Sequence, residues 1–261
     1  MTDAAPPAPR PPASPLAAAG LAVFSLGVWT AAFAWMSAVA AAAIALLPVV
    51  SFKRSHGFVG APGMAACLRL TLSRLRVTYD PGFDPARRGV FCQNHVSVLD
   101  GHVACAVIPH AFCGLMNHTH FRIPGYGWLM SLGRGIAVYP RASGRTAEIA
   151  QAARERAAYG LSILAFPEGH RTLDGDVREF RRGVFFMARD AGLPVVPVAV
   201  RGLFRVCPKG SWLIRPGAVE VYVGPQVETA GLSDEEVGAL AARLQRAIGG
   251  YVRTGEFALE G

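Results

Sequence analysis

Charged side chains are scarce in this sequence, and they are unevenly distributed. Asp, Glu, Lys and Arg make up only 17% of the 261 residues, whereas hydrophobic residues make up 52%. This composition excludes intrinsic disorder of the whole chain, which requires few apolar residues and many charges. The length suits one main domain. From residue 11 to residue 52 no charged side chain occurs at all, so a membrane segment is the first structure to consider.

The uncharged stretch is almost wholly apolar from Leu16 to Val50. About 20 apolar helical residues cross the ~30 Å core of a bilayer, so this stretch is too long for one upright span. It also lacks a clear central turn. A strongly tilted helix, a span with an interfacial extension and a helical hairpin in one leaflet all remain open. A secretory signal peptide fits poorly, because Arg10 is the only basic residue before a run that far exceeds a signal core.

These features divide the chain into three predicted segments. Residues 1 to 15, rich in Pro and Ala, are expected to form a disordered leader. Residues 16 to 52 are the predicted membrane segment, and residues 53 to 261 the main domain.

Acidic residues are too few to balance the basic ones. The chain has 18 Asp and Glu against 26 Lys and Arg, a formal net charge of +8. Five bases crowd just behind the apolar run: Lys53, Arg54, Arg69, Arg74 and Arg76. By the positive-inside bias they predict a main domain on the cytoplasmic side, where anionic lipids would attract it. Nucleic acid is not a predicted partner, because zinc-finger spacing, an RNA-binding aromatic signature and a basic region with heptads are all missing.

Cysteine pairs and metal-ligand clusters are missing too. The five cysteines are odd in number and form no CxxC pair, so reduced thiols in core positions are predicted. The only close histidine pair is His118 and His120, which we interpret as part of a loop surface. No metal site is predicted.

Short apolar runs alternate with helical patterns from about residue 89. Six runs predict strands: GVFCQ at 89–93, HAFCGLM at 110–116, GIAVY at 135–139, LSILAF at 161–166, PVVPVAV at 194–200 and AVEVYVG at 218–224. Several lack polar alternation, which is typical of strands buried on both faces. Helices are expected at about 98–108, 144–159, 180–191 and 233–248, and also at 61–76, where Arg lies opposite a helically spaced apolar face. An α/β domain is therefore predicted.

A polar cluster, Asn94-His95-Val96-Ser97-Val98-Leu99-Asp100, follows the first predicted strand. On one continuous helix His95 and Asp100 would lie about 140° apart and could not meet. If the helix instead starts near Ser97, with Ser97-x-x-Asp100 as its N-terminal box, His95 can fold back to the Asp carboxylate. That carboxylate would fix the imidazole tautomer and leave the other ring nitrogen to accept a proton. A helix cap beside an inert histidine remains the alternative.

Three further motifs follow predicted strands. The segment 166–172, FPEGHRT, combines a carboxylate with an Arg that could clamp an anion, or is only a turn. The strand at 135–139 leads to Arg141, which could pair with phosphate. The segment 193–200 contains Pro197, unusual in a central strand, which we interpret as shaping a wall.

The order and spacing of these motifs resemble the glycerolipid acyltransferase family of the 1-acylglycerol-3-phosphate acyltransferase type. The resemblance covers about residues 85 to 225 and rests on NHxSxxD at 94–100, the Gly-to-Arg block at 135–141, FPEGxR at 166–171 and Pro-Val-Val-Pro at 194–197. It implies a mixed central sheet flanked by helices for the acyltransferase domain, behind the N-terminal membrane segment.

The resemblance also implies a reaction: transfer of an acyl chain from acyl-CoA or acyl carrier protein to a lysophospholipid hydroxyl. His95 would deprotonate the hydroxyl and Asp100 would orient His95, help worth ~10² to 10⁴ in rate. Four other residues match family positions associated with the acceptor, the arginines for its phosphate and the glutamate for local geometry: Arg141, Glu168, Gly169 and Arg171. Neither an acyl-enzyme nor a metal is expected, and the acyl donor is a co-substrate rather than a cofactor.

The main prediction is a membrane-bound enzyme that makes phosphatidic acid from lysophosphatidic acid in phospholipid biosynthesis. The same chemistry on another lysolipid, such as a lyso-ornithine lipid, remains open, because a basic pocket could hold phosphate or carboxylate. A binding protein with a vestigial site is disfavoured by the intact motifs. A thioesterase using Ser97 is disfavoured because no Gly-x-Ser-x-Gly elbow surrounds that serine.

Overall fold

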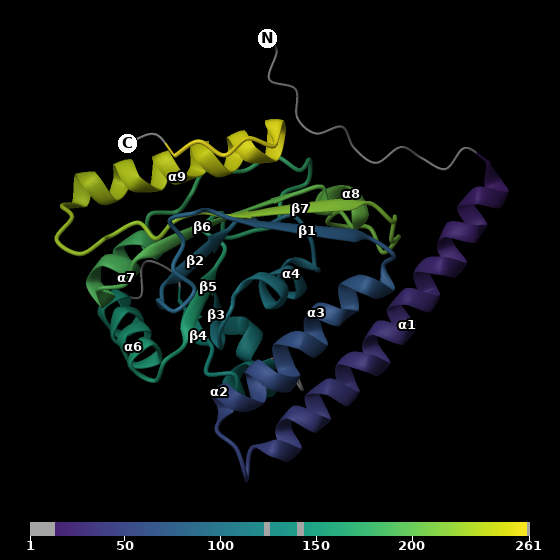
Figure 1. Ribbon diagram of the computed structural model, residues 1–261, viewed down its shortest axis with the longest axis horizontal. Coiled ribbons are helices and arrows are strands. Elements are labelled where there is room, and N and C mark those ends of the chain that lie inside the picture. Colours follow the sequence, from purple (N-terminus) through teal and green to yellow (C-terminus); the bar gives the residue numbers. More distant parts are fainter. Residues whose placement is uncertain (1–13, 123–125, 140–143, 260–261) are drawn as a thin grey trace.

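The main domain is built on one seven-stranded sheet (Figure 1). This computed structural model describes residues 14–122, 126–139 and 144–259. The strands are β1 Arg74–Tyr79, β2 Val90–Gln93, β3 Phe112–Asn117, β4 Ile136–Val138, β5 Ser162–Ala165, β6 Val195–Arg201 and β7 Ala218–Val223. Their order in the sheet is β1-β7-β6-β2-β5-β3-β4. All neighbours are parallel except β6 and β7, so the sheet is mixed, as predicted.

Helices cover both faces of the sheet. They are α1 Pro15–Leu46, α2 Phe52–Ser55, the π-helix η1 His56–Gly60, α3 Ala61–Leu70, α4 Asp100–Val107, the 3-10 helix η2 His118–Arg122, α5 Tyr126–Leu132, α6 Thr146–Ala158, α7 Gly183–Ala191, α8 Leu203–Val206 and α9 Asp234–Thr254. Residues of α6, α7 and α9 share one core cluster, and residues of α1, α3, α4 and α8 share the other. The two clusters hold the two faces of the sheet.

Alternate residues of the central strands enter opposite clusters. Val195 and Ala199 of β6 belong to the cluster with α9, whereas Val196, Val198 and Val200 belong to the cluster with α4. A strand that packs apolar side chains on both faces has no solvent side, which explains the missing polar alternation. All six predicted strands are present.

The prediction of one helix over residues 61–76 is wrong. Helix α3 ends at Leu70, Leu72 takes a left-handed conformation with φ 54°, and Arg74–Tyr79 forms the edge strand β1. In that strand Leu75 and Val77 are half-buried while their neighbours are exposed. Over so short a stretch, an edge strand with one buried face and an amphipathic helix can both contain a mixture of apolar and basic residues. Pairing with β7 makes this segment a strand.

The apolar N-terminal segment forms a continuous 32-residue helix, α1. After this helix the chain reverses direction. Helices α1 and α3 then pack side by side as a helical hairpin (Figure 1). The Trp35 Nε1 donates to the Gly63 carbonyl at 2.7 Å, and a Cβ at Gly63 would lie 2.6 Å from the Val39 methyls. The second arm of this hairpin thus lies after the predicted membrane segment. Of the predicted leader, residues 1–13 lie outside the described residues.

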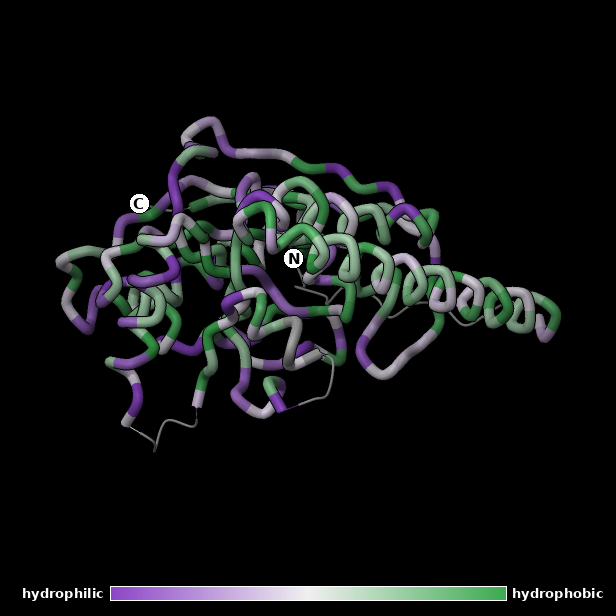
Figure 2. The backbone as a smooth tube through the Cα atoms, turned by 90° about the horizontal axis from the view of Figure 1, so that it is seen from below, coloured by the Kyte–Doolittle hydropathy of each residue, from purple (hydrophilic) through white to green (hydrophobic). Residues whose placement is uncertain are grey.

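Helix α1 presents a narrow stripe to the protein and a broad apolar surface outward. The residues Ser25, Val28, Ala32 and Val39 are buried, whereas Leu16 is 84% and Phe33 62% exposed. Figure 2 shows this helix projecting from the side of the domain, mostly green and white along its length. By length and composition α1 could cross a membrane. Its outward face is suited to lipid rather than water.

Candidate active site

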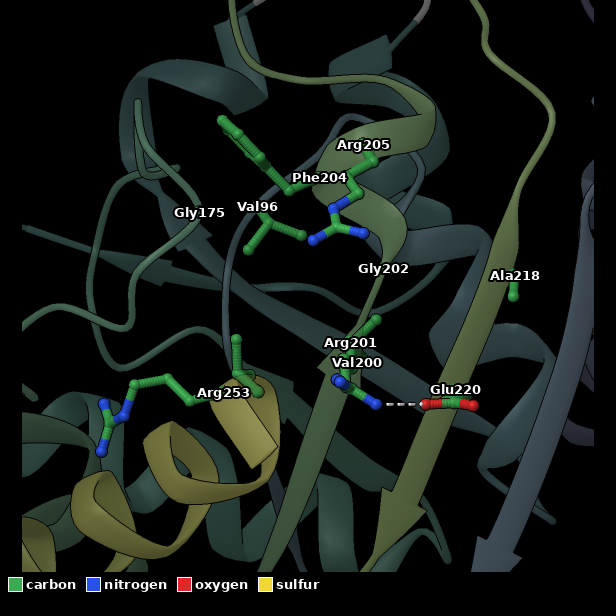
Figure 3. Close-up of a pocket in the computed structure, with 11 residues that line it drawn as sticks. Val96, Gly175, Val200, Arg201, Gly202, Phe204, Arg205, Ala218, Glu220 and Arg253 are labelled. Carbon is green, nitrogen blue, oxygen red and sulfur yellow. Dashed lines mark hydrogen bonds and ion pairs between the residues drawn. The ribbon is translucent and has the colours of Figure 1, made fainter. Parts of the chain in front are cut away.

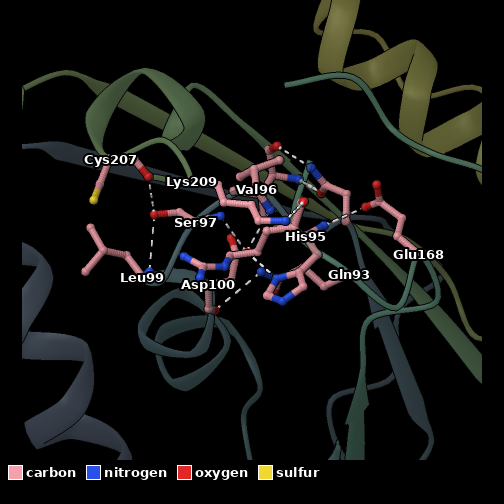
Figure 4. Close-up of polar contacts among 12 residues, drawn as sticks. Gln93, His95, Val96, Ser97, Leu99, Asp100, Glu168, Cys207 and Lys209 are labelled. Atoms are coloured by element: carbon pink, nitrogen blue, oxygen red, sulfur yellow. Dashed lines mark hydrogen bonds and ion pairs between the residues drawn. The ribbon is translucent and has the colours of Figure 1, made fainter. Parts of the chain in front are cut away.

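The polar motifs meet at one edge of the sheet. His95 comes two residues after the end of β2, and Glu168 comes three residues after the end of β5. The two strands are parallel neighbours, so their carboxyl ends lie side by side, where open α/β sheets place binding groups. Figure 4 shows the resulting cluster of polar contacts around His95.

His95 and Asp100 are in direct contact. The His95 Nδ1 lies 2.7 Å from the Asp100 Oδ2, which also accepts hydrogen bonds from the backbone N–H groups of Val96 and Ser97, both at 2.8 Å. Asp100 is the first residue of α4 and is only 1% exposed, whereas the His95 side chain is 23% exposed. Three donors on one buried oxygen hold the carboxylate in place.

This geometry leaves the second ring nitrogen of His95 available. Because Nδ1 faces the carboxylate, Nε2 is the atom that can accept a proton. Within the part of the chain that the structure describes, no group hydrogen-bonds Nε2. The imidazole also stacks on the Phe166 ring, with centroids 4.0 Å apart and planes 17° apart. Contact on one face and a hydrogen bond at Nδ1 define the orientation of the ring.

Glu168 binds backbone groups rather than facing open space. Its Oε1 accepts from the His95 N–H at 2.6 Å, and its Oε2 accepts from the Arg178 N–H at 2.8 Å. The Thr172 N–H donates to the His95 carbonyl at 2.9 Å, so the 166–172 segment holds the His95 backbone from both sides. Burial raises the pKa of Glu168 to about 7, against the lowering effect of the two backbone hydrogen bonds. The carboxylate thus joins the turn after β2 to the loop before α7.

The remaining predicted acceptor residues are placed differently from one another. Gly169 is exposed with φ +77°, and a Cβ there would lie 2.8 Å from the Arg181 guanidinium, so the turn requires glycine. Arg171 is partly exposed, and its carbonyl accepts from the Lys209 Nζ at 3.2 Å. Arg141 lies outside the described residues, so its role in binding phosphate stays a prediction.

Asn94 is a site residue to which the sequence motif alone assigned no role. Its fully buried side chain donates from Nδ2 to the Val200 carbonyl at 3.0 Å and accepts the Val200 N–H at 2.7 Å. The backbone pairing of β2 with β6 ends at Gln93 and Val198, and the amide side chain continues it by one step. Asn94 therefore fixes the start of the His95 turn to β6, through a contact no local spacing could reveal.

The prediction that the helix starts near Ser97, with Ser97 as its cap, is wrong: α4 starts at Asp100, its N-cap is Leu99, and no side chain caps it. Ser97 lies in the turn before the helix. Its buried hydroxyl donates to the Cys207 carbonyl at 2.7 Å and accepts from the Leu99 N–H at 3.2 Å. A histidine that activates a serine accepts the hydroxyl proton at Nε2, but the Ser97 hydroxyl donates to the Cys207 carbonyl instead, so this pair lacks the hydrogen bond of an activated serine nucleophile. The geometry argues against the thioesterase alternative.

The described residues contain no group of three His, Cys, Asp or Glu side chains that could hold a metal ion. All five cysteines are free, and four are buried: Cys67, Cys92, Cys113 and Cys207. Burial raises the pKa of the Cys105 and Cys113 thiols to about 12. Such thiols are poor nucleophiles, which agrees with the prediction of reduced, structural cysteines.

Known acyltransferases share sequence or fold with this chain. A family model described as "Acyltransferase" matches residues 74–201. A curated 1-acyl-sn-glycerol-3-phosphate acyltransferase of Pseudomonas aeruginosa is 32% identical over 47% of this chain and 48% of its own length. The beta 1-acyl-sn-glycerol-3-phosphate acyltransferase of Homo sapiens is 28% identical over 62% of this chain and 59% of its own. The chain thus spans about half the length of the curated relatives it matches.

A solved structure shares the fold. The crystal structure of the 1-acyl-sn-glycerophosphate acyltransferase PlsC from Thermotoga maritima superposes with a TM-score of 0.73, at 20% identity, over 89% of this chain and 95% of that one. The similarity therefore extends beyond the matched domain to most of the chain.

Proposed function

We propose that the chain is a glycerolipid acyltransferase of the PlsC type, which transfers an acyl chain from a thioester to the free hydroxyl of lysophosphatidic acid and so gives phosphatidic acid. The observation that carries the proposal is the 2.7 Å contact of the His95 Nδ1 with a buried Asp100, beside a free and partly exposed Nε2. The relatives named as 1-acyl-sn-glycerol-3-phosphate acyltransferases support the choice of acceptor.

In the proposed reaction His95 is the general base and Asp100 supports it. The His95 Nε2 accepts the proton of the acceptor hydroxyl as its oxygen attacks the thioester carbonyl carbon. The tetrahedral intermediate then collapses, the carbon–sulfur bond breaks, and the imidazolium returns the proton to the leaving thiolate. Asp100 stabilises the imidazolium through Nδ1. General-base help of this kind is worth ~10² to 10⁴ in rate.

The acceptor occupies the β5 side of the site in this proposal. Arg171 and Arg141 pair with its phosphate, since a planar guanidinium can bind phosphate through two hydrogen bonds. Glu168 positions the turn through the His95 backbone. Gly169 allows the left-handed backbone of the 166–172 turn. The donor is acyl-CoA or acyl carrier protein, and the reaction proceeds with the two substrates alone, without a cofactor.

We also propose that the helical hairpin attaches the enzyme to the membrane, with the catalytic domain on the cytoplasmic side. The exposed apolar face of α1 supports attachment, and the exposed Lys53 and Arg54 at the start of the second arm would meet anionic headgroups. The lysolipid and the product both partition into lipid. A site at the bilayer surface can therefore take up one and release the other without carrying an acyl chain through water.

The test is transfer of labelled acyl chains by the full-length protein in detergent. Acyl-CoA and acyl carrier protein are offered separately as donors, and lysophosphatidic acid and a lyso-ornithine lipid as acceptors. We expect labelled phosphatidic acid from the wild type and none from a folded His95→Ala variant. Label only in the ornithine lipid would move the activity to that acceptor, and label only in free fatty acid would indicate a thioesterase.

A further inference from the structure

A second basic feature lies beside His95, at the end of β6. A cavity of about 310 Å³ opens between the ends of β6, β7 and α9 and the short helix α8 (Figure 3). Its lining includes Val96, the residue after His95, and three arginines, Arg201, Arg205 and Arg253. We call this cavity the arginine pocket. Its volume is within the range of small-molecule sites.

The arginine pocket carries an excess of positive charge. The lining contains three arginines and one carboxylate, Glu220, whose Oε2 binds the Arg201 Nη1 at 2.9 Å. That contact uses one of five N–H donors of Arg201. The Arg253 guanidinium points away from Glu220 (Figure 3), so Arg201 and Arg205 supply the charge of the pocket. Arg205 is exposed, and among the described residues it has no hydrogen-bond or ion-pair partner. Figure 3 shows its guanidinium directed toward Val96. The remaining donors suit an anion such as a phosphate.

The backbone is shaped to bring Arg201 and Arg205 to one opening. Gly202 has φ +86°, and a Cβ there would lie 2.2 Å from the Ala218 carbonyl oxygen, so the turn from β6 into α8 accepts only glycine. Leu203 and Phe204 are buried and anchor α8, which leaves Arg205 on the outside. A charge presented by so constrained a turn is preorganised for a ligand.

The position of the pocket indicates which substrate it serves. In the sheet β2 lies between β5 and β6. The predicted acceptor residues Glu168, Gly169 and Arg171 follow β5, whereas Arg201 ends β6. None of these three acceptor residues lines the pocket, although Gly175 of the same loop does. Acyl transfer brings two substrates to His95, so a pocket that the predicted acceptor residues do not line is open to the donor. Apolar lining residues, among them Val96 and Phe204, suit a partly apolar arm behind the phosphate.

We propose that the arginine pocket binds the phosphate of the phosphopantetheine arm of the acyl donor. The proposal rests on the function proposed above. Acyl-CoA and acyl carrier protein both carry this phosphate, so the same chemistry serves either donor. Arg205 and Arg201 bind the phosphate, and the arm runs past Val96 to present the thioester to His95.

Direct binding tests the proposal independently of catalysis. The full-length protein in detergent is titrated calorimetrically with coenzyme A, with 4′-phosphopantetheine and with pantetheine, which differs from 4′-phosphopantetheine only in lacking the phosphate. We expect Arg205→Ala to weaken coenzyme A binding about tenfold, Arg205→Glu to weaken it further, and Arg205→Lys to retain part of it, because a charge-assisted hydrogen bond is lost. Pantetheine binding should be the same in all variants. Equal binding of coenzyme A by wild type and Arg205→Ala would overturn the proposal, even in a protein that forms no phosphatidic acid.

Steady-state kinetics then separates donor from acceptor. The matched control is Arg246→Ala, an exposed arginine of α9 outside the arginine pocket. We expect Arg205→Ala to raise the KM for the donor about tenfold with no change in the KM for the acceptor, and Arg246→Ala to change neither. A rise with acyl-CoA alone or with acyl carrier protein alone supports the pocket and identifies its donor. A rise in the acceptor KM alone would assign the pocket to the lysolipid phosphate and overturn the proposal.

Discussion

The turn that carries His95 is held by buried hydrogen bonds, whereas helix α1 exposes large apolar side chains. The turn after β2 is buried, and hydrogen bonds from Asn94, Asp100, Glu168 and Thr172 fix its backbone and its histidine. Helix α1 holds the domain by a narrow stripe and leaves large apolar side chains exposed. Hydrogen bonds therefore fix the positions of individual side chains at the catalytic edge, whereas the exposed face of α1 requires only apolar surroundings. The first region should be intolerant of single polar changes, and the second should respond to the sum of its apolar surface.

The largest effect is expected from Asp100→Asn. The amide cannot stabilise the imidazolium and favours the wrong tautomer of His95, so kcat should fall by on the order of 10² to 10⁴. Substitution by the similarly shaped Asn should keep the fold, which a melting curve would show. A kcat near that of the wild type would contradict the assignment of Asp100 as the residue that positions His95.

Removal of the Asn94 amide tests whether the turn depends on its connection to β6. In Asn94→Ala the buried N–H and C=O of Val200 lose their partners, which should lower the free energy of unfolding by roughly 2 to 4 kcal/mol. Chemical denaturation measures the change. Asn117→Ala is the control, because the exposed side chain of that asparagine binds only Thr119 among the described residues, and its loss should cost well under about 1 kcal/mol. Equal losses in the two variants would refute the special role of Asn94.

The apolar face of α1 should act additively. Replacing Val23, Leu26 and Phe33 together by Ser removes exposed apolar side chains without disturbing the buried stripe. Binding to anionic phospholipid vesicles should fall at least about tenfold, because each buried methylene contributes ~0.8 kcal/mol. Flotation of the protein with vesicles measures binding, and the melting temperature should change little. Undiminished vesicle binding would show that this face does not contact lipid.

The smallest effect concerns pH and the buried carboxyl of Glu168. Its folded pKa of about 7 lies above the ordinary value of 4.5, so the folded protein holds this proton more tightly than the unfolded chain. The resulting stabilisation is complete below about pH 4.5 and is lost as the pH rises through about 7. Glu168→Gln should therefore flatten the decline in melting temperature between pH 5 and 8, while the exposed Glu148→Gln should not. An unchanged slope in Glu168→Gln would contradict the raised pKa.

Much of the secondary structure was predictable from local pattern. The runs at β2, β5 and β6 are apolar and β-branched over lengths typical of buried strands, and the capping box of Ser233 with Glu236 marks the start of α9. The segment at 74–79 was missed. Leu75 and Val77, two residues apart, share one face of a strand but lie on opposite sides of a helix, and this short alternation was merged with the helical pattern before it. The partner of this segment, β7, lies far along the chain, and a local pattern carries no information about that pairing.

The sequence by itself determined the pieces of the active site. The spacing from His95 to Asp100, the turn between them and the motif at 166–172 are local features, because a turn forms within a few residues. The tertiary structure alone decided which pieces meet. Strand order placed the turn after β2 between the ends of β5 and β6, brought Asn94 to Val200, and gathered Val96, Arg201 and Arg253 around one pocket. These contacts join residues far apart in the chain, so packing of the whole sheet and its helices determines them.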